Sequence, residues 1–129
     1  MALIPTLTLT DTTTYSDDIS FSVTDSLTVA SPAQALSLVT VTTTGGNHII
    51  LPSVDAKRYL YVKHLGVATL GGGAVTTTLA VETADDTAVM TLAAGEFMFA
   101  PIHDGNATLI QLQASGSTIV AEYAYWTAG

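Results

Sequence analysis

Polar and apolar residues alternate with a period of two along much of this chain, and this pattern constrains the fold more than any other feature. Leu7 and Leu9 alternate with threonines, and Phe21 and Val23 alternate with serine and threonine. Successive side chains of a β-strand point to opposite faces, so the pattern predicts strands with one face toward a core. The many Thr, Val, Ile and Tyr residues favour the same structure because β-branched and aromatic side chains fit a pleated surface.

Short segments of this kind recur at regular spacing, with turn residues between them. Besides the alternating segments, strand candidates cover residues 36–42, 48–51, 59–65, 87–92, 96–100, 108–114 and 118–126, and the alternation at 75–81 predicts another. Turn signals rich in Gly, Asp and Ser separate them, for example at 71–73, 85–86 and 115–117. Strands of this length and spacing are typical of a sandwich or barrel. We predict an all-β, antiparallel, jelly-roll-like sandwich.

The N-terminal segment differs from the rest of the chain. Residues 1–14 are Thr-rich and nearly uncharged, and Pro5 argues against a central strand there. We predict an extended N-terminal arm over residues 1–14 and a single β-sandwich domain over 15–129. The arm is either a frayed terminus or an edge strand that adds to a neighbouring subunit, with Leu7 and Leu9 as its apolar face.

The charge balance excludes several kinds of partner. The chain has 129 residues and a net charge of −8, with only Lys57, Arg58 and Lys63 as basic residues. Nucleic-acid binding depends on clustered basic groups that neutralise phosphates, so we expect no direct contact with nucleic acid. An anionic membrane surface would repel the chain, and no apolar run approaches the ~20 residues of a membrane helix. The N-terminus lacks the features of a secretory signal, so assembly in a cytoplasm is expected.

The residues that could carry out chemistry do not form a known constellation. His48, His64 and His103 are the only histidines, and none forms a closely spaced pair that could bind one metal. No Gly-x-Ser-x-Gly elbow occurs, and the glycines at 71–73 lack the Lys-Ser/Thr pair of a phosphate-binding loop. Acidic pairs such as Asp85-Asp86 lie in predicted turns, where they normally cap the backbone. We predict that the chain is not an enzyme and has no metal site or cofactor.

Aromatic residues in the predicted strands allow two interpretations, carbohydrate binding and core packing. The set comprises Tyr59, Tyr61, Tyr123, Tyr125 and Trp126. Exposed rings can stack on sugars, as in a carbohydrate-binding module, whereas buried rings pack in the core. Residues 59–62 and large parts of 119–126 are apolar on both strand faces. Such a strand is either central in a sandwich or covered by another subunit, which indicates oligomerisation.

Three segments carry a resemblance to a known group of proteins. Residues 57–66 read KRYLYVKHLG, residues 92–102 read LAAGEFMFAPI and residues 118–123 read TIVAEY. Over residues 55–126, this order resembles small virion structural proteins of tailed bacteriophages. His64 departs from the pattern, which has Asn or another small polar residue after the Lys. The motifs are strands and turns, so no ligand-binding residues are carried over.

The resemblance implies a capsid decoration (cement) protein that stabilises the phage head. Such a protein is expected to form a homo-oligomer, with a trimer favoured, and to bind the major capsid protein or another virion protein. Its expected location is the virion, assembled in the host cytoplasm. The alternative is a receptor- or carbohydrate-binding β-module of a phage tail or fibre. For the subunit interface we predict Leu7, Leu9, Tyr59, Tyr61, Tyr123 and Tyr125. A chain with so few lysines has little side-chain entropy to lose on assembly.

Overall fold

The computed structural model of the chain describes residues 1–10, 20–45, 48–102 and 109–129. These residues contain strands and no helix, which confirms the predicted all-β class and leaves no helix among them that could cross a membrane. The strands are β1 (Ala2–Leu3), β2 (Thr6–Thr10), β3 (Ser20–Thr24), β4 (Leu27–Val41), β5 (Ile49–Leu51), β6 (Arg58–His64), β7 (Leu79–Glu82), β8 (Ala88–Leu92), β9 (Phe97–Ile102), β10 (Ile110–Ala114) and β11 (Ile119–Ala128).

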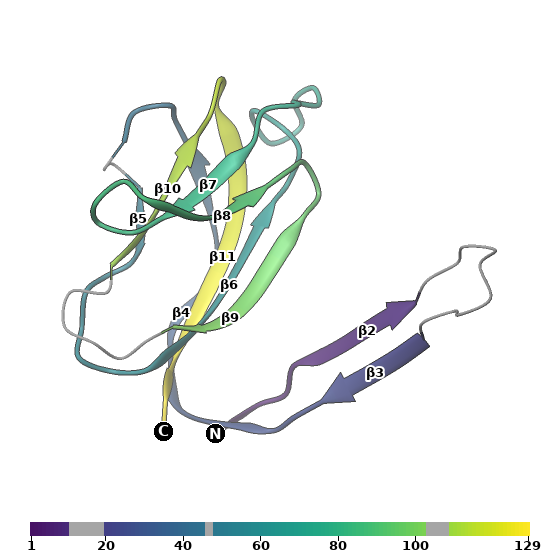
Figure 1. Ribbon diagram of the computed structural model, residues 1–129, viewed down its shortest axis with the longest axis vertical. Coiled ribbons are helices and arrows are strands. Elements are labelled where there is room, and N and C mark those ends of the chain that lie inside the picture. The colour runs from purple at the N-terminus through teal and green to yellow at the C-terminus, as the bar shows by residue number, and fades with distance from the viewer. Residues whose placement is uncertain (11–19, 46–47, 103–108) are drawn as a thin grey trace.

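Two antiparallel sheets pack face to face (Figure 1). The large sheet has the order β1-β4-β11-β6-β9, and the small sheet has the order β5-β10-β7-β8. The chain therefore crosses between the sheets several times after β4, and sequence-distant strands such as β4 and β11 become neighbours. Apart from the two-residue β1, the two sheets contain eight strands, and eight strands in two sheets with such crossings are the arrangement of a jelly roll. The predicted jelly-roll-like sandwich is confirmed.

Strand β6 shows how the sequence pattern sets the two faces of the large sheet. Its burial alternates residue by residue, with Leu60 and Val62 fully buried and Tyr59 and Tyr61 partly exposed. Leu60 and Val62 face the small sheet, where they join Leu112 of β10 in one hydrophobic core. Burial of each such aliphatic side chain contributes about 1.5–3 kcal/mol to folding. The core thus holds the two sheets together, and the other face of the large sheet points away from it.

One predicted strand is shorter than its alternation indicates. The pattern at 75–81 continues through threonines, but regular pairing begins only at Leu79. Before it, the Val75 N–H donates to the Gly66 carbonyl, and the Thr78 N–H donates to the Ser115 hydroxyl. These bonds take the place of a strand ladder, because they satisfy backbone groups that the ladder would otherwise pair.

The N-terminal region is a hairpin joined to the sandwich at both ends. Strands β2 and β3 pair in register from Thr6↔Thr24 to Thr10↔Ser20, and they form a two-stranded sheet of their own. Before the hairpin, β1 pairs with β4 through Ala2↔Thr28. Figure 1 shows the hairpin projecting away from the sandwich. The predicted boundary between arm and domain at residue 14 lies outside the described residues, and the paired strands lie on both sides of it.

Strand β9 is the last strand of the large sheet on one side, and β8 holds the corresponding place in the small sheet. β9 contains Pro101, which lies opposite Tyr59 of β6. Proline has no N–H to donate, so it is tolerated in a strand at a sheet edge. The turn from β8 to β9 contains Gly95, whose φ of 85° favours glycine over residues with a side chain.

Candidate assembly surface

The face of the large sheet that points away from the core is rich in aromatic rings, and we call it the outer face. Its aromatic members come from three adjacent strands, β11, β6 and β9, and are Tyr59, Tyr61, Phe97, Phe99 and Trp126. Registers place Tyr61 beside Phe99 and Tyr59 beside Trp126. Glu122 of β11 lies on the outer face because it pairs with Lys63. Leu38 of β4 pairs with Glu122 and therefore extends the outer face across the sheet.

Contacts between these rings form a connected cluster. Tyr59 and Phe99 stack with centroids 6.2 Å apart and an interplanar angle of 12°. Phe99 also contacts Trp126 at 6.5 Å in a tilted arrangement, and the Lys57 ammonium lies 5.8 Å from the Tyr59 ring centre. Phe97 is 59% exposed and Leu38 is 49% exposed. The outer face is thus an exposed apolar patch built around a connected group of rings.

Tyr61 adds one polar interaction to the outer face. Its hydroxyl donates a hydrogen bond of 2.9 Å to the Glu122 carboxylate on β11. Burial, this hydrogen bond and the charge of Glu122 raise the pKa of Tyr61 to about 12, with burial the largest cause. A raised pKa in the folded state means that the neutral phenol is preferred. Its contribution to stability is complete below the ordinary value near 10 and is lost as the pH rises toward about 12.

Replacement of Glu122 by Gln is expected to lower the pKa of Tyr61 toward the ordinary value, because the charge is removed while the burial remains. The measurement is the tyrosinate absorbance during alkaline titration, with the Tyr61→Phe chain subtracted to isolate this ring. Glu96→Gln, a change in the turn before β9, serves as the control and is expected to leave the titration unchanged. An unaltered Tyr61 titration in Glu122→Gln would contradict the assignment.

The hairpin formed by β2 and β3 has two chemically different faces. One face carries hydroxyls, with Thr6 bonded to Thr24 at 2.9 Å and Thr8 bonded to Ser22 at 3.1 Å. The other, which we call the apolar hairpin face, consists of Leu7, Leu9, Phe21 and Val23, each between 44% and 54% exposed. An isolated two-stranded hairpin is marginally stable in water, so contact of this apolar face with another surface would stabilise it.

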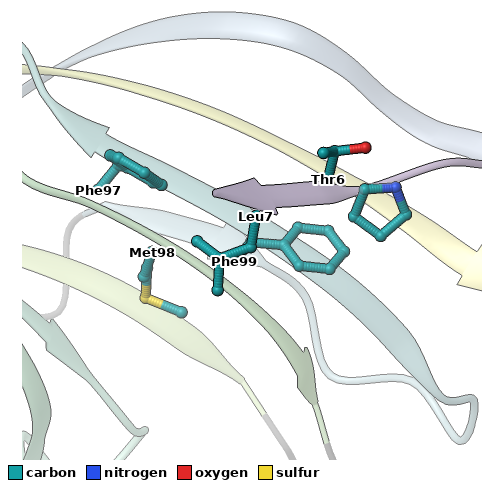
Figure 2. A pocket seen from close by; sticks show the side chains of 6 residues that line it. Thr6, Leu7, Phe97, Met98 and Phe99 are labelled. Carbon is teal, nitrogen blue, oxygen red and sulfur yellow. The ribbon is translucent and has the colours of Figure 1, made fainter. Parts of the chain in front are cut away.

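A groove lies between the beginning of the hairpin and the outer face (Figure 2). Its volume is about 530 Å³. One side of the groove is formed by Pro5, Thr6 and Leu7, just before and at the beginning of β2. The other side is formed by Phe97, Met98 and Phe99 of β9. The two apolar surfaces therefore border the same space.

The structure divides the predicted interface residues into three groups. Leu7 and Leu9 lie on the exposed apolar hairpin face. Tyr59 and Tyr61 lie on the outer face, as described above. Tyr123 and Tyr125 lie on the opposite side of the large sheet, because they pair with the buried residues Val62 and Leu60 and pack against the core. The structure thus does not bring the four tyrosines to one surface, and a role for the six residues in a subunit interface stays a prediction.

Sequence reasoning did not single out Phe21 and Val23 or Phe97 and Phe99 as surface residues. A signal for the first pair was present, since residues 6–10 (TLTLT) and 20–24 (SFSVT) have the same alternation of hydroxyl and apolar side chains. Two neighbouring segments with matching alternation predict a hairpin with one polar and one apolar face. For Phe97 and Phe99 the alternation with Met98 was visible, but nothing in it distinguishes the inner from the outer face.

The histidines and acidic turns take structural roles where they are described. His48 accepts a hydrogen bond from the Thr42 N–H through Nε2 at 3.1 Å, and His64 is fully buried between backbone partners. Asp86 accepts a 2.6 Å hydrogen bond from Gln111. Within residues 1–10, 20–45, 48–102 and 109–129, no group of three or more His, Cys, Asp or Glu residues gathers where it could hold a metal ion. His103 lies outside the described residues.

Comparisons with protein-family models, with curated protein sequences and with solved structures find no match to this chain.

Proposed function

We propose that this chain is a structural protein of a bacteriophage particle and that it decorates the capsid as a cement protein. The observation that carries the proposal is the pair of apolar surfaces that border one groove, the outer face and the apolar hairpin face. Exposed apolar surface of this extent is typical of protein–protein contact. A small β-sandwich with such surfaces suits a component that is held between other protein subunits.

The sequence resemblance supports the same proposal. Its three segments, residues 57–66, 92–102 and 118–123, contribute to β6, β9 and β11, which are adjacent in the large sheet. The residues that resemble phage virion proteins therefore build the sheet whose outer face is exposed. In a particle, many weakly bound copies of the chain would reinforce a capsid through avidity.

The test is whether purified phage heads contain the chain and bind it. Mass spectrometry of the particles is expected to detect its peptides, and heads made without it are expected to bind the purified chain on co-sedimentation. Phe97→Ser on the outer face is expected to reduce binding, whereas Val89→Ser, at an exposed position on β8 of the small sheet, is expected to leave binding unchanged. Particles that lack the chain, and heads that do not bind it, would refute the virion role.

A second function is favoured by one specific observation, the stacked rings of Tyr59 and Phe99 beside Trp126 and Lys57. Partly exposed rings of this kind can stack on sugar faces, so the alternative is a receptor- or carbohydrate-binding module of a phage tail or fibre. Binding on a glycan array that is lost in Trp126→Ala, but retained in Leu38→Ala, would favour this alternative over decoration.

A further inference from the structure

The apolar hairpin face and the outer face match each other in size and chemistry. Strands β2 and β3 have five residues each, which gives a length of about 17 Å, and the six residues of β9 extend about 20 Å. Both hairpin strands lack charged residues. The aromatic rings of the outer face are likewise uncharged, so contact between them and the hairpin strands buries no charge of the hairpin.

Within one chain, these surfaces do not cover each other. Only the beginning of the hairpin, at Pro5 to Leu7, borders β9, and the groove between them is unfilled. Leu9, Phe21 and Val23 lie farther along the hairpin, which projects away from the sandwich (Figure 1). They remain about half exposed, as does Phe97 on the outer face.

We infer that the hairpin of one copy of this chain packs its apolar face on the outer face of a second copy. Each chain carries both halves of the contact, so a second copy supplies what the first copy lacks. Two chains that exchange hairpins, or several that pass them around a ring, cover the apolar hairpin face and part of the outer face on every copy, since a two-stranded hairpin is narrower than the five-stranded sheet. Because each chain then takes part in two such contacts, more apolar surface is buried per chain than in a single contact.

The negative charge of the chain does not prevent contact between two copies at these surfaces. The chain has a net charge of −8, and close approach of two copies is favourable only where the contacting surfaces are free of acidic groups. The hairpin strands meet that condition. On the outer face Glu122 is engaged by Tyr61, and Lys63 lies opposite it in the register. The inference deepens the proposed assembly role, but it is tested on the purified chain without a capsid.

The first experiment measures the mass of the full chain by light scattering coupled to size exclusion. The expected mass is at least twice the 13.3 kDa of one chain. Phe21→Asp, which places a charge on the apolar hairpin face, is expected to weaken association by at least about 100-fold. Ser22→Asp places the same charge on the hydroxyl face of the hairpin and is expected to keep the mass. A monomeric parent chain, or equal masses for the parent and Phe21→Asp, would overturn the inference.

The second experiment identifies the contact. The chain contains no cysteine, so single cysteines introduced into separate chains report only contacts between copies. A mixture of Leu9→Cys and Phe99→Cys chains is expected to form a disulfide-linked dimer, whereas Thr8→Cys with Phe99→Cys is not. Cross-links of Phe99→Cys only with itself would overturn the inference in favour of direct contact between outer faces. A chain that does not self-associate but binds phage heads would refute this inference alone. A chain that self-associates as described but does not bind heads would refute the capsid role alone.

Discussion

Replacement of Leu60 by alanine is expected to lower the free energy of unfolding by about 3–4 kcal/mol. Leu60 is fully buried on β6, at the centre of the core between the two sheets. Its neighbours across the large sheet are Tyr125 and Ala100, and the strand ladders that hold both residues limit their movement into the space left by the missing methyl groups. The loss therefore combines reduced apolar burial with a cavity, and it is a large part of the 5–15 kcal/mol typical of a domain.

Urea unfolding followed by circular dichroism measures this effect, with all chains at one concentration because association also adds to stability. Leu70→Ala is the matched control, since Leu70 is 66% exposed, and it is expected to change stability by less than about 0.5 kcal/mol. A loss below about 1 kcal/mol for Leu60→Ala would contradict the assigned core.

Replacement of His64 by phenylalanine is expected to cost about 2–4 kcal/mol, because two backbone groups lose their partner. His64 is fully buried at the end of β6. Its Nδ1 accepts a hydrogen bond from the Gly66 N–H at 2.9 Å, and its Nε2 lies 2.9 Å from the Thr77 carbonyl. Since Gly66 donates to Nδ1, the proton of the neutral ring is assigned to Nε2, which donates to Thr77. The ring thus ties β6 to the segment that precedes β7.

His64→Asn provides the graded comparison, because a shorter amide can reach only one of the two partners. The His64→Asn chain is expected to be less stable than the parent chain but more stable than His64→Phe. Lys63→Ala, a change one residue away on the outer face, is the control and is expected to change the free energy of unfolding by less than about 0.5 kcal/mol. Amide hydrogen exchange at Gly66 is expected to accelerate in His64→Phe. Unchanged exchange there would contradict the proposed role of the ring.

The strands of the sandwich were predictable because alternation is a local property that burial on one side imposes directly. Segments 59–65 and 118–126 coincide closely with β6 and β11 for that reason. The assignment of faces was not predictable, since Tyr61 and Tyr123 both lie in segments that are apolar on both sides. Only the register decides between them: Tyr123 pairs with the buried Val62, and Tyr61 pairs with Ala124 on the outer face.

The hairpin was predictable in part. Its alternation was recognised in both strands, but their pairing was not, because residues 11–19 separate them and contain no two-residue turn signal such as Asn-Gly. The segment was therefore interpreted as an extended arm. Leu7 and Leu9 were named as surface residues on this basis, but their partners Val23 and Phe21 were not, since strand pairing is a property of the folded chain.

Pro101 has a consequence for how the chain behaves when many copies are crowded together. An exposed sheet edge can template the addition of strands from other molecules, which is the route to cross-β fibrils. In β9, the outermost strand of the large sheet, Pro101 removes one donor from the row that an added strand would need. Uncontrolled polymerisation along this edge is thereby disfavoured, and association is directed to the faces of the sheets, where side chains and not backbone groups select the partner.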